Sequence, residues 1–369
     1  MSASLTNISE QENNTLKFTL SGLNVSLANA IRRTILSDIP VVGIYTQTYK
    51  DNQCTIEKNT CRLHNEILKQ RLSCIPIHSK NMDTLPGNYV LEVEKKNDTD
   101  NMMYITTEDF KIKNKQNDNY LTKEETRKIF PANDKTNMYI DFTRLRPKIS
   151  NTIQGEELKL AAEFSVHRAK EDSMYNVVSK CSYGNTPDMD KAEAEWKSME
   201  QRLRSEDLTQ EEIDFQKRNF YLLDAQKYYK EDSFDFVIQT IGIYENKEIM
   251  LKACGILKDK FQLLLKSIST DALSIVLSET TMENCYDIIL VDEDYTIGKV
   301  LEYFIYDNYF LKEQSVLFCG FKKFHPHDES SRIRIAFKDK VDKQMVGEYL
   351  YKVCDKSINF YSEVEKLFT

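Results

Sequence analysis

Two stretches of the sequence, one near each end, share the same order of hydrophobic and polar positions. In each, alternate residues are apolar over a short segment, and a turn then leads to apolar residues spaced three or four apart. The first predicts a strand over 16–20 and a helix capped by Ser26 that runs to about Asp38; the second predicts a strand at 288–290 and a helix opening at Thr296. A shift of 270 positions superimposes six apolar residues of the two stretches. This indicates an internal repeat, or two strand–turn–helix units that share a period by chance.

The segments that complete each stretch are also alike. Strands over 315–325 and 332–338 and a long amphipathic helix over 341–368 follow the second stretch. The equivalents for the first lie far downstream, as a strand over 234–240 and a helix over 248–268. The pattern predicts an α+β fold of two lobes, the first of which is interrupted by other sequence.

The larger interruption, residues 46–180, is predicted to be mostly β. Its strand-like stretches include 89–94, 138–142 and 157–166.

A second interruption, residues 185–232, is charged and helical in pattern. It predicts helices over 190–204 and about 210–229, with the charges forming a solvated face. Residues 1–14 are polar, and we expect them to fray.

Composition narrows the classes of function. Hydrophobic residues make up 41% of the 369 residues and charged residues 29%, enough for a real core. The net charge of −8 argues against a protein that coats nucleic acid, which needs clustered positive charge. The longest apolar runs, such as 39–45 and 288–291, fall short of the roughly 20 residues that span a bilayer. The first residues lack the pattern of a secretory signal, so an intracellular protein is expected.

Metal and cofactor chemistry is not expected. The eight cysteines form no CxxC pair, and most fall in apolar segments, which favours reduced core thiols over a zinc site. His325 and His327 have no third ligand nearby in sequence. The acidic run 292–294 falls at a strand-to-helix turn, where carboxylates favour the helix N-terminus.

Several motifs carry a family resemblance. Residues 27–40 (LANAIRRTILSDIP) and 63–77 (LHNEILKQRLSCIPI) stand in order and at the spacing of two motifs of the alpha-like RNA polymerase subunits, the second written LHDE and RLGLIP there. Residues 293–299 (EDYTIGK), 318–326 (FCGFKKFHP) and 332–335 (RIRI) resemble the EDHTLGN, FAGYKxPHP and IRI motifs of their smaller partner. The chain thus resembles the bacterial alpha, archaeal D and third eukaryotic subunits at one end, and the archaeal L and eleventh eukaryotic subunits at the other.

This resemblance covers roughly 16–180 and 234–368 and implies two alpha-like dimerisation lobes in one chain, an intramolecular pseudo-heterodimer with an inserted, mostly-β alpha insertion domain. The implied domains are a third-subunit-like lobe (1–45 and 181–270, with the helical insertion 185–232), the insertion domain (46–180), a connector (271–285) and an eleventh-subunit-like lobe (286–369). Fusion of the two partners is the arrangement of large nucleocytoplasmic DNA viruses, which implies a viral protein of the host cytoplasm and the virion.

The sequence departs from the family at several motif positions. Tyr295 replaces a His, Lys299 an Asn, Asn65 an Asp and Ser73 a Gly. None of these is a catalytic loss. Residues 79–88 contain no cysteine where many relatives carry a metal loop, so neither a zinc site nor an iron–sulfur cluster is expected, and no cofactor is predicted.

The resemblance also suggests site residues. We expect the intramolecular dimerisation seam to include apolar residues of the two repeated helices, although each could equally face the sheet of its own lobe: Leu27, Ile31, Ile35, Ile297, Leu301, Phe304 and Ile305. Arg32 and Arg33 lie off the apolar stripe; the pattern alone makes them solvated, whereas the family motif places them toward the second-largest polymerase subunit. Glu66 and Arg71 are either a local pair or plain surface charges.

The function implied is a non-catalytic assembly subunit of DNA-directed RNA polymerase that serves transcription. It would bind the second-largest, then the largest subunit, together with small subunits, without sequence-specific DNA binding or a membrane. No Ser-His-Asp set, phosphate-binding glycine loop or HExxH motif is evident. An alternative is an enzyme that modifies nucleotides or RNA ends, which would need a pocket of clustered ionisable groups that the sequence does not reveal. A third is a regulatory adaptor outside any polymerase.

Overall fold

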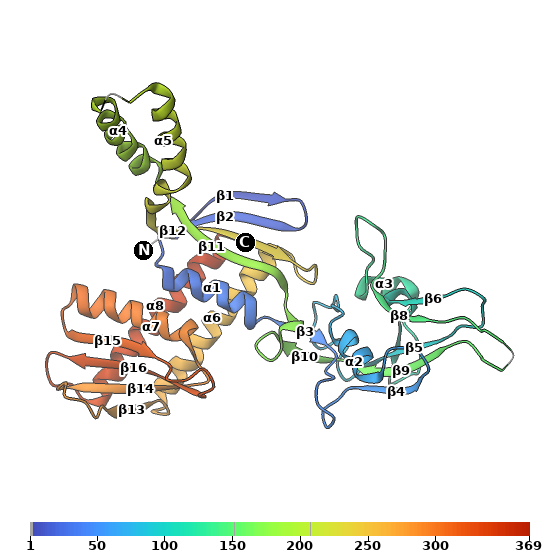
Figure 1. Ribbon diagram of the computed structural model, residues 1–369. Coiled ribbons are helices and arrows are strands. Elements are labelled where there is room, and N and C mark those ends of the chain that lie inside the picture. Colours follow the sequence, from blue (N-terminus) through green and yellow to red (C-terminus); the bar gives the residue numbers. More distant parts are fainter. Residues whose placement is uncertain (1–2, 151, 207) are drawn as a thin grey trace. The chain divides into compact units, whose positions relative to one another are not determined.

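The computed structural model describes residues 3–150, 152–206 and 208–369. The chain forms two compact units (Figure 1). The first comprises Met1–Thr34, Lys180–Gln239 and Met250–Thr369, and the second comprises Ile35–Ser179 and Thr240–Ile249. Both ends of the chain therefore belong to the first unit.

The first unit contains a four-stranded sheet in the order β1 (Ser4–Gln11), β2 (Thr15–Ser21), β12 (Tyr229–Thr240) and β11 (Val178–Pro187). The predicted strands at 16–20 and 234–240 are confirmed as β2 and β12. Phe18 and Phe236 stand opposite each other in this antiparallel pair, with ring centroids 5.2 Å apart. Both rings are buried, and they lie on the two central strands of the sheet.

The expectation that residues 1–14 fray is wrong. Residues of β1 pair antiparallel with β2, where Leu5 stands opposite Leu20, and the Asn7 amide donates to Thr19 Oγ1 at 3.2 Å. Nearly all of β1 is exposed. Strand β1 is held at the edge of the sheet by main-chain hydrogen bonds to β2. Such bonds do not require alternating apolar side chains, so the sequence shows no strand pattern there.

A second four-stranded sheet of the first unit has the order β13 (Ser274–Leu277), β14 (Cys285–Val291), β16 (Ser330–Phe337) and β15 (Val316–Lys322). The strands predicted at 288–290, 315–325 and 332–338 are present. Strand β13 lies in the segment predicted as a connector; it is short and mostly exposed, which gave it no pattern to detect.

Four helices lie between the two sheets (Figure 1). They are α1 (Val25–Ser37), α6 (Asn246–Ser269), α7 (Tyr295–Ile305) and α8 (Lys343–Lys366). The π-helical segment η4 (Tyr306–Lys312) follows α7 and was not predicted. The predicted α+β content is confirmed.

The repeat seen in the sequence has a structural counterpart. Strands β2 and β14 begin and end 270 positions apart, and helices α1 and α7 begin 270 positions apart. Ser26 is not the N-cap of α1, however. The Ser26 main-chain N–H donates to Asn24 Oδ1 at 2.9 Å, and 270 positions later the Thr296 N–H donates to Asp294 Oδ1 at 2.8 Å. Asn and Asp are both strong N-caps, so the two repeats start their helices by the same device.

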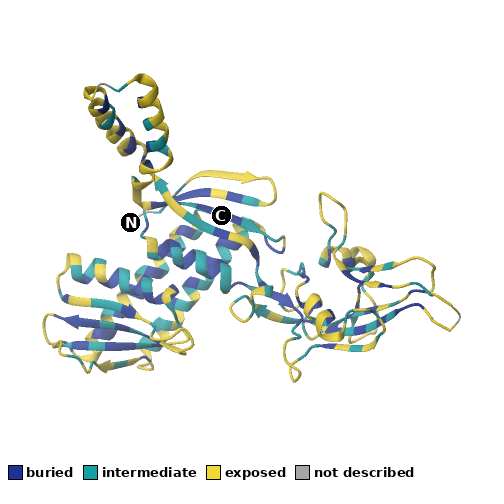
Figure 2. Cartoon of the chain, viewed as in Figure 1, coloured by how far each residue is buried: buried dark blue, intermediate teal, exposed yellow. Residues whose placement is uncertain are grey.

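A helical hairpin interrupts the first unit. Helices α4 (Met189–Ser205) and α5 (Gln210–Leu222) bury Trp196 and Phe220 between them, and much of their remaining surface is exposed (Figure 2). Thr209 is the N-cap of α5 and forms a capping box with Glu212. The helix ends earlier than predicted, because a short 3₁₀ turn (Asp224–Lys227) leads into β12 at Tyr229.

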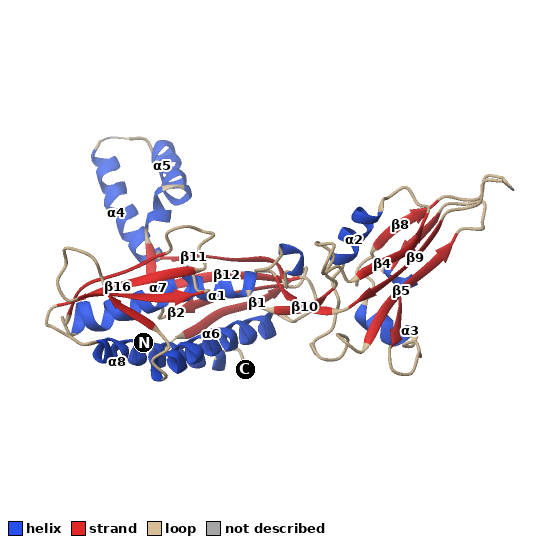
Figure 3. Ribbon diagram, turned by 90° about the horizontal axis from the view of Figure 1, so that it is seen from below, coloured by secondary structure: helices blue, strands red, loops and turns tan. Residues whose placement is uncertain are grey.

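The second unit is mostly β (Figure 3). Its largest sheet has the order β4 (Cys54–Asn59), β9 (Glu157–Glu163), β5 (Tyr89–Lys96) and β7 (Lys111–Asn114). Two strand pairs accompany it, β6 (Met103–Thr106) with β8 (Asp141–Leu145), and β3 (Pro40–Gly43) with β10 (Ser165–Arg168). The single strand predicted over 157–166 is thus two strands that belong to different sheets.

Helices α2 (Asn65–Ser73) and α3 (Lys123–Ile129) complete the second unit. The suggested pair between Glu66 and Arg71 is wrong. The Arg71 guanidinium donates to the main-chain oxygens of Asp141 and Phe142, both at 2.7 Å, and so ties α2 to β8, while Glu66 contacts His64. Among the helices of the described ranges, none has the length and apolar character needed to cross a bilayer.

Candidate functional site

The candidate site lies where elements from the two ends of the chain meet in the first unit. All seven residues predicted for the seam are buried, each with at most 1% of its surface exposed: Leu27, Ile31, Ile35, Ile297, Leu301, Phe304 and Ile305. Burial fits both readings of the sequence, the seam and the lobe's own sheet. The Phe304 ring contacts the Tyr303 ring, at a centroid distance of 5.2 Å, and the Lys356 ammonium, 5.1 Å from the ring centroid; both partners lie after the predicted connector. The assignment of the seven residues to the seam stays a prediction.

Aromatic contacts join the two ends directly. The Phe18 ring on β2 meets the Phe368 ring at the end of the chain, with centroids 5.1 Å apart and an edge-to-face angle of 75°. Phe261 on α6 stacks with Tyr361 on α8 at 6.1 Å. Both pairs are buried. The sequence prediction placed the seam on the shorter helices. The ring contacts instead join β2 to Phe368 and the long helix α6 to the long helix α8. The apolar stripes of the two long helices were the signal in the sequence.

Arg33 links the first repeat to the second. Its Nη2 donates to Asp294 Oδ2 at 2.6 Å, and its Nε donates to Thr296 Oγ1 at 2.9 Å. Asp294 is the N-cap of α7, so Arg33 contacts the residue that caps the start of the repeated helix. The same carboxylate thereby serves the helix N-terminus and a guanidinium from α1.

The charge balance at this link is set by opposing effects. Burial raises the pKa of Asp294, but the hydrogen bonds from Thr296 and the positive charge of Arg33 outweigh burial and hold that pKa below its ordinary value. The two side chains are each about one-third exposed. The pair is therefore screened in part by water and is worth less than a fully buried one.

Two further ion pairs connect segments before and after the predicted connector, and a third involves its first residue, Asp271. Lys258 on α6 pairs with Glu365 on α8. Lys260 lies 3.5 Å from Glu293, and Lys343 lies 2.8 Å from Asp271. The acidic run before α7 is thus engaged by basic groups of α1 and α6, in agreement with the structural role expected for it.

The two arginines predicted to contact the second-largest subunit have different surroundings. Arg33 has the intramolecular partners described above. Arg32 donates from Nε to Asn29 Oδ1 at 3.0 Å, one turn earlier on α1, and stays partly exposed. The contact with another subunit remains a prediction for both, and the geometry leaves Arg32 the more available of the two.

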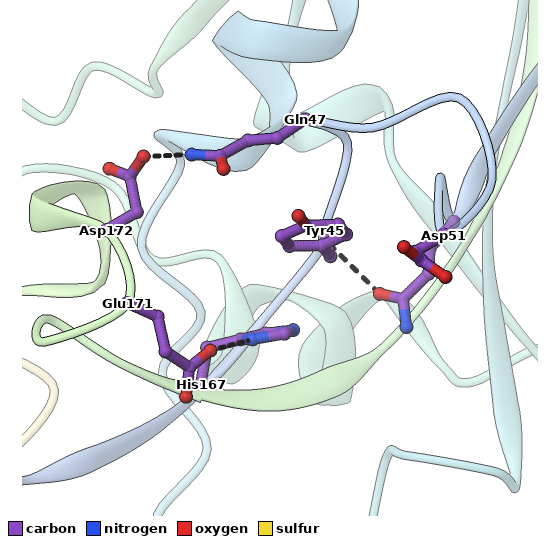
Figure 4. A pocket seen from close by; sticks show the side chains of 7 residues that line it. Tyr45, Gln47, Asp51, His167, Glu171 and Asp172 are labelled. Carbon is purple, nitrogen blue, oxygen red and sulfur yellow. Dashed lines mark hydrogen bonds and ion pairs between the residues drawn. The ribbon is translucent and has the colours of Figure 1, made fainter. Parts of the chain in front are cut away.

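A pocket in the second unit was missed by the sequence reasoning, which found no cluster of ionisable groups. Tyr45, Asp51, His167, Glu171 and Asp172 line a cavity of about 400 Å³ (Figure 4). The His167 ring lies between those of Tyr45 and Tyr175, at centroid distances of 5.4 and 4.6 Å. The segment 45–51 and the segment 167–175 are more than 100 positions apart in the sequence, so no local motif could have revealed that they meet.

His167 and Glu171, which line the pocket, belong to a serine–histidine–carboxylate chain. His167 Nε2 lies 2.6 Å from Ser165 Oγ, and its Nδ1 lies 2.7 Å from Glu171 Oε2. The Ser165 hydroxyl, however, donates to Gln53 Oε1 at 2.5 Å, and the Tyr45 main-chain N–H donates to the same oxygen at 3.0 Å. Because an amide oxygen only accepts, the serine proton points away from His167. In a hydrolase with a nucleophilic serine, the serine hydroxyl donates to the histidine. The geometry here therefore does not favour a hydrolase site.

Potential metal ligands do not cluster in the described ranges. His325 and His327 stack edge-to-face with centroids 5.1 Å apart. Within the described ranges, no three His, Cys, Asp or Glu side chains converge closely enough to hold a metal ion. Five of the eight cysteines are buried and only Cys74 is exposed, in line with the prediction of core thiols.

Comparison with known proteins identifies relatives. A family model described as the RNA polymerase Rpb3/Rpb11 dimerisation domain matches residues 17–261. The DNA-directed RNA polymerases IV and V subunit 3B of Arabidopsis thaliana is 24% identical over 301 residues, which cover 71% of this chain and 91% of that protein.

Shorter matches reach proteins of two further kinds. The DNA-directed RNA polymerase subunit Rpo3 of Pyrococcus furiosus is 37% identical over 70 residues, 19% of this chain and 24% of that subunit. The DNA-directed RNA polymerases I and III subunit RPAC2 of Danio rerio is 36% identical over 70 residues, 19% of this chain and 58% of that subunit. All three relatives are named as subunits of DNA-directed RNA polymerases.

Proposed function

Because the chain belongs to the family of the RNA polymerase Rpb3/Rpb11 dimerisation domain, we propose that it is a non-catalytic assembly subunit of a DNA-directed RNA polymerase. The two partners of the family's dimer would be fused here into one polypeptide. The lobe containing β2, α1, β12 and α6 would correspond to the larger partner, and the lobe from β14 to α8 to the smaller.

The observation that carries this proposal is the set of contacts between the two ends of the chain. The Phe18–Phe368 and Phe261–Tyr361 ring pairs and the Arg33–Asp294 ion pair join the two lobes within one compact unit. Covalent linkage makes docking of the second lobe intramolecular, with an effective concentration on the order of millimolar. Such a chain would present a completed pair of lobes without a search for a partner.

The completed pair would act as the platform on which the second-largest and then the largest polymerase subunit assemble, with small subunits joining them. Arg32 is our choice for the contact with the second-largest subunit, since it is partly exposed and bonds within α1, whereas Arg33 is engaged by Asp294 and Thr296. The fusion points to a large nucleocytoplasmic DNA virus as the source, and hence to the host cytoplasm and the virion as the places of action. Sequence-specific DNA binding and independent catalysis form no part of the proposal.

Assembly is tested by co-expression of the chain with the two large subunits of the same polymerase. We expect the three to co-purify in equal stoichiometry, and the isolated chain to incorporate no nucleotide after rigorous purification. Nucleotide incorporation by the isolated chain would refute a scaffold role. Failure to bind either large subunit would favour an adaptor outside the polymerase.

The contact surface is tested by charge reversal. Arg32→Glu should weaken binding of the second-largest subunit at least tenfold, while far-UV circular dichroism stays unchanged. Lys217→Glu on α5 is the matched control, because Lys217 is also exposed on a helix but lies outside the family motifs. Equal effects of the two substitutions would show that the α1 surface is assigned wrongly.

A further inference from the structure

A second cavity of the second unit, of about 510 Å³, lies beside β5, β7 and α3 and is distinct from the pocket around His167. Its apolar lining comes from Phe110, Leu121 and Phe130. The rings of Phe110 and Phe130 pack edge-to-face at 5.2 Å, and Phe110 packs in the same way on Phe142 at 5.6 Å. This lining is therefore anchored in the core of the unit.

The walls of the cavity are held in place before any ligand arrives. Thr106 and Asp109 form a capping box around the 3₁₀ turn η1 (Thr107–Asp109), and Thr122 and Glu125 form another at the start of α3. Each box ties the side chain of one residue to the main chain of the other. A preorganised cavity of this kind loses little conformational entropy on binding.

The rim of the cavity carries more positive charge than its own pairs neutralise. Lys95 pairs with Asp109 at 2.8 Å, and Arg127 with Glu108 at 2.9 Å. By contrast, Lys111 and Lys123 form no ion pair with any residue that the structure describes. The Lys111 ammonium lies 5.9 Å from the ring centroid of Tyr120, which is half exposed.

Glu94 also lines the cavity. It stands opposite Lys159 in the β5–β9 register, but Lys159 forms its ion pair with Glu57 at 2.7 Å, so Glu94 offsets part of the positive charge of the rim. The rim therefore keeps a small excess of positive charge, carried by Lys111 and Lys123, above an apolar lining.

We propose that this cavity is a docking site for a short acidic segment of a partner protein that inserts one bulky apolar side chain. The apolar side chain packs against Phe110, Leu121 and Phe130, and flanking carboxylates pair with Lys111 and Lys123. Four basic side chains against three acidic ones on the rim leave an excess too small for a run of phosphates, which needs clustered positive charge, and this favours a peptide over a nucleic acid. The site is independent of the proposed polymerase function, since it uses none of the residues of the two lobes.

The test uses the full-length chain and fluorescence anisotropy. The probe is a fluorescein-labelled seven-residue peptide with acidic residues on both sides of a single Phe. A peptide with lysines in the acidic positions and single-stranded oligo-dT are compared with it. The variant Lys111→Glu/Lys123→Glu reverses the free charges, and Lys111→Gln/Lys123→Gln only removes them. Lys128→Glu is the matched control, as Lys128 is an exposed lysine of α3 that does not line the cavity.

We expect the acidic peptide to bind, and its dissociation constant to rise at least tenfold with Lys111→Glu/Lys123→Glu and less with the Gln pair. Lys128→Glu should leave it within twofold of wild type, and binding should weaken between 50 and 300 mM salt. Circular dichroism and the unfolding temperature of each variant establish that it is folded. No binding of the acidic peptide at millimolar concentration would overturn the proposal. So would an equal loss with Lys128→Glu, or preferential binding of oligo-dT through the same lysines.

Discussion

Removal of the Arg33–Asp294 link tests how the two repeated strand–turn–helix stretches are held together. Arg33→Ala deletes two hydrogen bonds, at 2.6 Å to Asp294 and 2.9 Å to Thr296, without changing the N-cap of α7. A charge-assisted hydrogen bond is worth about 1.5–3 kcal/mol when buried, and an exposed ion pair about 0.2–1 kcal/mol. Because both side chains are about one-third exposed, we expect a loss of roughly 1 kcal/mol in the free energy of unfolding.

Asp294→Ala removes the same contact and also the N-cap, which is worth about 1 kcal/mol. We therefore expect a loss of roughly 2 kcal/mol. Asp342→Ala provides the matched control. Asp342 caps α8 through the Met345 N–H at 2.8 Å and forms no ion pair with any residue that the structure describes. The stability lost in Asp342→Ala should therefore reflect the cap alone.

The assay is urea unfolding followed by far-UV circular dichroism, applied to Arg33→Ala, Asp294→Ala and the double variant. The double-mutant cycle should give a coupling energy of about 0.5–1 kcal/mol that falls as salt is raised. A coupling energy of zero would refute the reasoning, since it would mean that the link between α1 and the start of α7 contributes nothing to stability. Equal losses for Asp294→Ala and Asp342→Ala would lead to the same conclusion.

The link also has a defined pH dependence. The folded-state pKa of Asp294 lies below its ordinary value of 3.8. Its contribution to stability is therefore complete above pH of about 4 and is lost as the pH falls through the lowered value. The difference in unfolding free energy between wild type and Asp294→Ala should shrink on acidification below pH 4; a difference that grows instead would contradict the sign of the shift.

Three further predictions concern other parts of the chain. Asp287→Asn should cost about 3 kcal/mol of unfolding free energy in urea titrations, because the buried carboxylate pairs with both Arg332 and Arg334. The hydrogen bond from Arg334 holds the pKa of Asp287 low, so this stabilisation too is lost only in acid; a neutral substitution at pH 7 would argue against it. Gly298→Ala should cost about 1–3 kcal/mol, as an added Cβ would meet the Phe321 ring at 2.1 Å, whereas Gly255→Ala, with open space around it, should be neutral or stabilising in the same thermal unfolding assay. Replacing α4 and α5 by a short loop should leave the unfolding temperature of the remainder within a few degrees, because the hairpin buries its own small core around Trp196 and Phe220; a collapse of the whole chain on deletion would show that this core is not self-contained.

Several features of the fold could be predicted because they depend on neighbouring residues. Strands β2, β14 and β16 bury one face, and helices α6 and α8 carry long apolar stripes. The spacing of apolar residues in each of these segments is therefore enough to predict them. The 270-residue repeat was visible for the same reason. Edge strands β1 and β13 were not found, since exposed strands held by main-chain hydrogen bonds need no particular side chains.

For the candidate site, the burial of the seven apolar residues could be predicted from the sequence, because an amphipathic helix separates the stripe it buries from the residues it exposes. Which partners they meet could not. The pairing of Arg33 with Asp294 spans 261 positions, and the convergence on His167 joins strands and loops more than 100 positions apart.

By itself, the sequence determined the α+β character of this protein, most of its buried strands and helices, and the presence of two similar strand–turn–helix stretches, one near each end. Only the tertiary structure decided that rings from β2 and α6 lie against rings from the C-terminal segment, that Arg33 reaches the start of the second repeated helix, and that Ser165 turns its proton away from His167. The physical reason is range. Hydrophobic periodicity and helix capping act over a few residues, whereas the contacts that make a seam or a pocket are chosen by packing among segments that the chain brings together only once it has folded.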